Sequence, residues 1–164
     1  NKNTAFRIVE PGKTIFMRIS DSPVLVSACL LGLRCRYNAE PVANARVLAL
    51  AKMHTLIPVC PEQLGGLPTP RPPAERLGER VVSNDGTDVT SAFIKGAEET
   101  LLLARILGCK TAILKARSPS CGHGRIYDGS FTGKLIPGSG VTAELLAKNG
   151  IRVYTEDELP GQID

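Results

Sequence analysis

The sequence predicts an open α/β sheet in a single domain, and three short apolar runs carry that prediction. Residues 24–28, 55–59 and 111–114 have the length of strands, and each run stops at loop-forming residues. Segments with helical periodicity lie between them, and strands that alternate with helices pair in parallel. We therefore expect an open, mainly parallel sheet with helices on both faces, which is a Rossmann-like plan. A chain of 164 residues can bury an adequate core for such a domain.

One helix is expected between the first two strands. The first strand covers residues 24–28, and a helix is predicted over residues 42–53. Apolar residues recur there at helical spacing, at Val42, Ala45, Leu48, Ala49 and Met53. The second strand then runs to Cys60.

A rigid segment and a hairpin follow the second strand. Residues 65–75 contain four prolines, which favour an extended and pre-ordered conformation. A pair of valines and an Asp-Gly turn predict a small β-hairpin insertion over residues 80–88.

The second half of the chain contains the longest expected helix, over residues 90–107. Its predicted apolar face consists of Phe93, Ala97, Leu101 and Ala104, and Gly108 provides the stop. The elements that remain are a third strand, a glycine-rich segment, a short helix and a last strand, over residues 111–114, 122–140, 141–148 and 151–154.

The first residues match no element of this plan. Met17 fits a natural start, so we expect an expression-derived or disordered leader over residues 1–16 and a single domain over residues 17–164. No secretory leader is recognisable, and the cysteines number five, which is odd. We therefore expect a reducing, cytoplasmic setting in which the thiols are free or bind metal.

Composition excludes some classes of partner. No apolar run approaches the roughly 20 residues that cross a bilayer, so we expect no membrane role. The net charge of +4 comes from basic residues spread along the chain, and aromatic residues make up only 4% of it. This argues against a nucleic-acid surface, which shows clustered basic residues or stacking aromatics. A basic pocket for a small anion remains open.

Three cysteines occupy equivalent positions at strand ends. Cys29, Cys60 and Cys121 each follow the carboxyl end of an expected strand, and parallel neighbours bring these ends to one edge of a sheet. A single buried cysteine is more often part of a core, but three in equivalent places predict a three-thiolate site. Cys109 falls at the opposite edge and is expected to be structural. Cys35 fits either a fourth ligand or a resolving thiol.

The ligand pattern bears on the choice of metal. Structural zinc uses two short-spaced ligand pairs, which this chain lacks. His54 lies at the wrong edge, which leaves His123 as the only histidine within reach. Three separated thiolates without an obvious fourth ligand suit a [4Fe-4S] cluster with one open iron, and iron of this kind binds sulfur well.

Long motifs in the same order resemble the DUF523 family, whose characterised members include 2-thiouracil desulfidases. The resemblance extends over about residues 24–159, and the matching segments are residues 24–32, 35–37, 60–75, 118–122 and 126–129. It implies that Cys29, Cys60 and Cys121 hold a [4Fe-4S] cluster whose fourth iron has no protein ligand. It also implies that this iron captures the thiocarbonyl sulfur of a 2-thiouracil-like pyrimidine, after which water adds to the carbon and sulfide leaves without net electron transfer.

Other polar residues lie close to these cysteines in the sequence. Glu62 is expected to activate water or protonate the product, although pairing with Arg71 or capping a helix is an equal alternative. Ser118 and Ser120 flank Pro119, where a hydroxyl can bond the base, the cluster or its own turn. Four cations are candidates for charge balance or substrate binding, with solvated surface charge as the default: Arg36, Arg71, Lys115 and Arg117.

Two functions from other classes stay open. A non-catalytic iron–sulfur, metal or sulfide-binding module would bind without turnover. A metal-free enzyme would use Cys121 as the nucleophile and His123 as its base, although the residues are too close in sequence to fix that contact. Residues 122–124 do not complete a phosphate-binding loop. The shortage of basic clusters favours a small thiolated nucleobase or nucleoside over thiolated RNA.

Overall fold

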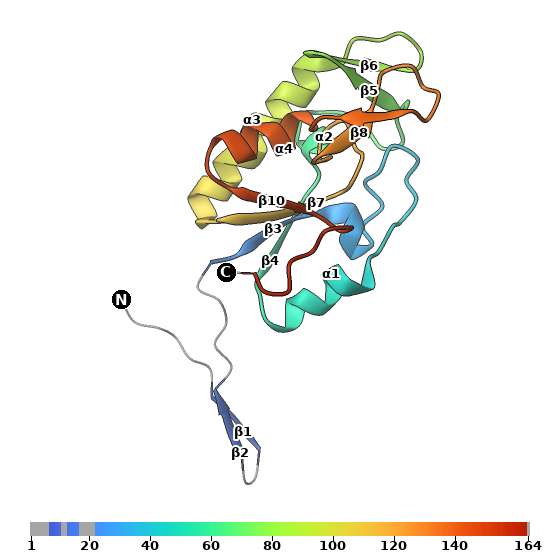
Figure 1. The fold of residues 1–164 in the computed structure, drawn as a ribbon. Helices are drawn as coiled ribbons and strands as arrows, with labels where there is room; N and C mark the ends of the chain where they lie inside the picture. The colour runs from blue at the N-terminus through green and yellow to red at the C-terminus, as the bar shows by residue number, and fades with distance from the viewer. Residues whose placement is uncertain (1–6, 11–12, 17–21, 164) are drawn as a thin grey trace.

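The structure, a computed structural model, describes residues 7–10, 13–16 and 22–163 (Figure 1). Its centre is a four-stranded sheet in the order β10-β7-β3-β4, and every neighbouring pair is parallel. The strands are β3 (Val24–Ser27), β4 (Leu56–Val59), β7 (Thr111–Leu114) and β10 (Arg152–Thr155). All four positions of β3 and of β7 are buried, which explains why the two central strands form continuous, mostly apolar runs. The predicted parallel sheet is confirmed.

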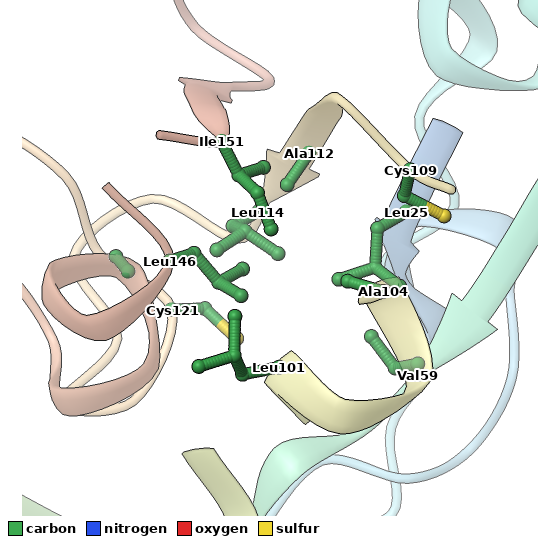
Figure 2. Packing of buried hydrophobic residues seen from close by; sticks show 11 residues of the cluster. Leu25, Val59, Leu101, Ala104, Cys109, Ala112, Leu114, Cys121, Leu146 and Ile151 are labelled. Atoms are coloured by element: carbon green, nitrogen blue, oxygen red, sulfur yellow. The ribbon is translucent and has the colours of Figure 1, made fainter. Parts of the chain in front are cut away.

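Helices cover both faces of this sheet, as predicted. On one face α3 (Thr90–Leu107) packs against α4 (Val141–Lys148), while α1 (Ala45–Ala49) lies on the other (Figure 1). Two buried apolar clusters separate these helices from the sheet. Figure 2 shows the first cluster, in which Leu101 and Ala104 of α3 and Leu146 of α4 meet Leu25 and Leu114 of the strands. Two short elements lie close to the carboxyl ends of strands, a 3₁₀ helix over Ala28–Leu31 and α2 (Pro61–Leu64).

The α3 helix has the predicted bounds and the predicted face. Phe93, Ala97, Leu101 and Ala104 are all buried. Gly108 ends the helix in the left-handed conformation, at φ 70°, which a glycine adopts without a steric penalty. In the part of the chain that is described, no helix is long and apolar enough to cross a membrane.

The predicted face of the first helix was wrong. The regular helix begins only at Ala45 because Asn44 caps it, with the Asn44 side chain accepting hydrogen bonds from the backbone N–H groups of Arg46 and Val47. After Ala49 the chain continues as a 3₁₀ helix over Leu50–Lys52. This start places Val47 in the core and leaves the expected core residues Leu48 and Met53 exposed.

The small hairpin is present, but its strands differ from the prediction. β6 (Arg80–Ser83) forms its strand ladder with β5 (Ala74–Leu77), which precedes it, while the residues after the Asp-Gly turn make only a few backbone contacts with β6. Beyond that turn, Asp88 contributes a single bridge to Val82. The proline-rich segment ends at Pro73, so Ala74 is free to start a strand.

Two further hairpins were not predicted. β8 (Arg125–Tyr127) pairs with β9 (Leu135–Pro137) inside the glycine-rich segment. Within the expected leader, β1 (Arg7–Glu10) pairs with β2 (Lys13–Phe16), and Figure 1 draws this hairpin away from the sheet. Residues 1–6 lie outside the described part of the chain, and the origin of residues 1–16 stays a prediction.

Candidate functional site

A cavity of about 570 Å³ opens at the carboxyl edge of the sheet. The loops that follow β3, β4 and β7 form much of its wall, and the three strand-end cysteines all line it. This is the edge at which open α/β folds place ligands. The structure therefore brings together Cys29, Cys60 and Cys121, as their positions in the sequence predict.

Each of these cysteines is held by a different local structure. Cys29 belongs to the 3₁₀ helix after β3, and Cys60 immediately precedes α2, whose first residue is Pro61. Cys121 lies in the turn after β7, where the backbone N–H groups of Ser120 and Cys121 both donate to Ser118 Oγ at 3.1 Å. Cys121 also packs into the first apolar cluster against α3 and α4 (Figure 2).

The surroundings of Cys60 and Cys121 favour the protonated thiol. Burial raises the pKa of the Cys121 thiol to about 12. The pKa of Cys60 is also raised, first by its hydrogen bond with the Cys35 thiol and then by burial, and the pKa of Cys35 is raised chiefly by its hydrogen bond with Cys29. A metal centre binds thiolates, so it would replace these protons.

The other two cysteines, Cys35 and Cys109, lie in different places relative to the cavity. Cys35 lines the cavity, and the Cys60 thiol donates a hydrogen bond of 3.6 Å to the Cys35 carbonyl. Cys109 is absent from the cavity wall and is buried in the first apolar cluster, as a structural residue would be.

Among the described residues, no three His, Cys, Asp or Glu side chains are placed to hold one ion. His123 is absent from the cavity wall, and its Nδ1 is buried without a hydrogen-bond partner in the described part of the chain.

Glu62 and Arg71 both line the cavity and form an ion pair. The Arg71 Nε donates to Glu62 Oε2 at 2.6 Å, so the pairing that the sequence left as an alternative is present. The guanidinium also donates to the Cys35 carbonyl at 3.0 Å and to Thr69 Oγ1 at 3.1 Å. Arg71, whose side chain is only 5% exposed, thereby joins α2 to the loop that carries Cys35.

The two serines differ in position. Ser118 lines the cavity, whereas Ser120 does not. Ser120 is buried, and its hydroxyl forms a hydrogen bond of 3.0 Å with Thr142 Oγ1 in α4. Ser120 thus anchors the turn that carries Cys121.

The remaining candidate cations also line the cavity. Lys115 pairs with the buried carboxylate of Glu156, which accepts a second hydrogen bond from Ala116 N at 2.7 Å. Arg117 pairs with Asp157 at 3.3 Å where both side chains are exposed, and the Arg36 guanidinium lies 5.5 Å from the centre of the Tyr37 ring.

Several cavity residues were not predicted from the sequence. They are Tyr37, Glu75, Tyr127 and Phe131 in the wall, with Glu156 behind Lys115. The first three lie inside or at the end of the segments that resemble DUF523, so those motifs were the available signal. Nothing in the local sequence marks Phe131 or Glu156.

Comparison with known proteins agrees with the geometry of the site. The model of the 2-thiouracil desulfurase family matches residues 24–158. A curated relative, the uncharacterized protein YbbK of Bacillus subtilis (strain 168), is 44% identical over 146 residues, which are 83% of this chain and 97% of that protein. A solved structure, the [4Fe-4S]-dependent thiouracil desulfidase TudS (DUF523Vcz), superposes with a TM-score of 0.80 at 48% identity and covers 85% of this chain and 93% of its own. The chain belongs to the 2-thiouracil desulfurase family.

Proposed function

We propose that the protein is a [4Fe-4S]-dependent desulfidase that converts a thiolated pyrimidine and water into the oxygenated base and hydrogen sulfide. The observation that carries this proposal is the meeting of three strand-end thiols at one cavity. Its volume of about 570 Å³ lies within the roughly 300–1,000 Å³ of small-molecule sites, so a free base or a nucleoside is the proposed substrate. The similarity to TudS supports the choice of cofactor and reaction.

Cys29, Cys60 and Cys121 are the proposed ligands of the cluster. When bound, the cluster would supply an iron without a protein ligand, which attracts the soft thiocarbonyl sulfur and polarises the C=S bond. Cys35 would stay a hydrogen-bonding neighbour of these ligands. All five cysteines are free thiols, which supports the proposal of a reducing, cytoplasmic compartment.

Glu62 is the proposed proton carrier. Replacing C=S by C=O requires water to lose its protons and the departing sulfur to gain them, and a carboxylate in the cavity wall can make both transfers. The bond of 2.6 Å from Arg71 fixes one carboxylate oxygen and leaves the other for water.

Ser118 is the proposed hydroxyl that orients the substrate. Its oxygen accepts hydrogen bonds from two backbone N–H groups, so its own O–H group is left to donate into the cavity. A carbonyl or ring nitrogen of a pyrimidine can accept that bond. Ser120 would not contact the substrate; its hydrogen bond with Thr142 supports the turn that carries Ser118.

The cations are assigned different roles. Lys115 and Arg117 are proposed to offset the negative charge of the thiolates, since both line the cavity that the cysteines share. Arg36 is the proposed contact for a polar edge of the substrate. Arg71, which was expected among the substrate contacts, would act through Glu62 and the Cys35 carbonyl.

The test is anaerobic reconstitution of the wild-type protein and of Cys29→Ser, Cys60→Ser and Cys121→Ser. Iron and acid-labile sulfide per chain, the charge-transfer absorption of the cluster and the release of uracil from 2-thiouracil are measured. Each substitution is expected to abolish cluster binding and turnover. Cys35→Ser, inside the cavity, and Cys109→Ser, outside it, are the controls and should keep the cluster.

Other outcomes would overturn the proposal. A wild-type cluster without turnover of thiolated bases would favour the binding module. Turnover that survives removal of iron would favour the metal-free cysteine enzyme, although His123 does not line the cavity as that function requires.

A further inference from the structure

The cavity gathers aromatic side chains that the proposed chemistry does not use. The whole chain has only three tyrosines, four phenylalanines and no tryptophan. Tyr37, Tyr127 and Phe131 nevertheless all line this one cavity. Phe131 is 40% exposed, so it is not simply part of the core. A ligand with an aromatic face would account for this concentration.

The loop that carries Phe131 is held by a buried carboxylate. Glu75, in β5, is 9% exposed, and its Oε2 accepts hydrogen bonds from the backbone N–H groups of Gly129 at 2.9 Å and Phe131 at 3.0 Å. These charge-assisted bonds link the β5-β6 hairpin to the loop between β8 and β9.

The backbone of Phe131 is itself unusual. Its φ is 56°, a left-handed conformation that bulky residues rarely adopt. The hydrogen bond to Glu75 holds the chain in this conformation. The backbone from which the ring enters the cavity wall is therefore fixed by the fold.

We propose that Phe131 is a substrate-binding residue that stacks on the pyrimidine ring, and that Glu75 is the positioning residue that holds it there. This inference rests on the proposed function, from which it takes the ring as ligand. The polar groups of the cavity, among them Glu62 in α2 and Ser118 in the turn after β7, come from other parts of the chain, so a stacked ring can still present its polar edge to them. Stacking on an aromatic side chain binds flat bases whatever their substituents.

The test compares Phe131→Ala and Phe131→Tyr in the cluster-loaded protein. Loss of stacking should raise KM for 2-thiouracil by about tenfold and leave kcat nearly unchanged, and the tyrosine should restore wild-type values. A second readout is independent of turnover: calorimetric titration with uracil should show a similar loss of affinity in Phe131→Ala.

Variants of Glu75 test its positioning role. Glu75→Ala should raise KM as Phe131→Ala does. Glu75→Gln should keep the wild-type KM, because an amide oxygen can accept both N–H bonds. Glu79→Ala, exposed between the two strands of the same hairpin, is the matched control and should behave as wild type. Iron content shows that each variant keeps its site.

The outcomes separate this inference from the proposed function. A wild-type protein without turnover would overturn the function, while the uracil titration would still decide the stacking. An unchanged KM and unchanged uracil affinity in Phe131→Ala would overturn the stacking, as would a wild-type protein that binds no uracil. If Glu75→Gln raises KM as much as Glu75→Ala does, the positioning role of Glu75 is overturned.

Discussion

A methyl group at Gly96 would push α2 away from α3. A Cβ atom there would lie 2.7 Å from the Pro61 carbonyl carbon and closer still to its oxygen. Ordinary contacts begin near 3.4 Å, so relieving the contact with the carbonyl carbon alone would separate the two helices by about 0.7 Å (3.4 minus 2.7), and the closer oxygen requires a larger shift. The close approach is reciprocal, because a Cβ at Gly65 would lie 2.9 Å from the Ala92 carbonyl carbon.

This separation would move residues of the site. α2 begins directly after Cys60 and carries Glu62, so Gly96→Ala should displace both without touching either. A misplacement of about 1 Å can reduce turnover about 100-fold. Overpacking typically costs about 1–3 kcal/mol, and the better helix propensity of alanine returns about 1 kcal/mol, so the net loss of stability should be up to about 2 kcal/mol. The loss of about 100-fold in turnover corresponds to about 2.7 kcal/mol and should slightly exceed the loss of stability.

The assay combines urea unfolding, iron content and desulfuration of 2-thiouracil. Lys95→Ala is the control, since Lys95 is the exposed neighbour of Gly96 on the same helix. Wild-type iron content and turnover in Gly96→Ala would refute the view that close packing of these helices positions the site.

Three further predictions concern charged residues. Glu156→Ala leaves the buried N–H of Ala116 unpaired and should lower the free energy of unfolding by about 1–3 kcal/mol in urea titrations, while Asp157→Ala, which breaks an exposed ion pair, should lower it by less than about 1 kcal/mol. Arg71→Lys cannot reproduce the guanidinium bonds to Glu62 and to the Cys35 carbonyl, and kinetics should show a loss in kcat of roughly tenfold or more. Hydrogen bonds from Thr90, then Arg80, lower the pKa of Asp88 from 3.8 to about 2, so its contribution to stability is present above pH 3.8 and lost as the pH falls to about 2.

Each of these predictions has a contrary result. Equal effects of Glu156→Ala and Asp157→Ala would show that burial does not decide the strength of these pairs. If Arg71→Lys keeps the wild-type kcat, the positive charge of Arg71 is sufficient and the geometry of its guanidinium bonds is not required. Asp88→Asn should be less stable than wild type at pH 6, and the difference should shrink as the pH falls through about 2, so an undiminished difference at pH 2 would contradict the assignment.

The parts of the fold that were predictable are those in which local pattern and burial agree. β3, β7 and α3 have apolar positions that match the core, and Gly108 ends α3 where expected. The face of α1 was not predictable from apolar spacing, because the Asn44 cap sets where the helix starts. The β8-β9 hairpin depends on Glu75, more than 50 positions away from the residues it binds, and no local pattern reveals such a bond.

The site also contains some features that the sequence predicts and others that it does not. The cysteines could be located because strand ends converge at one edge, a rule of topology that needs no side-chain detail. The partners of the charged residues could not, since Lys115 and Glu156 are separated by 41 positions and meet only through the pairing of β7 with β10.

The placement of the three proposed ligands on separate strand ends couples cofactor loading to folding. Residues 29, 60 and 121 are far apart in an unfolded chain, so a group that requires all three thiolates binds the native state almost exclusively. By mass action, its binding free energy then adds to the stability of the sheet. The melting temperature of the domain should rise on loading with the cluster, and a mutation anywhere in the core that favours unfolding should lower the apparent affinity for iron and sulfide.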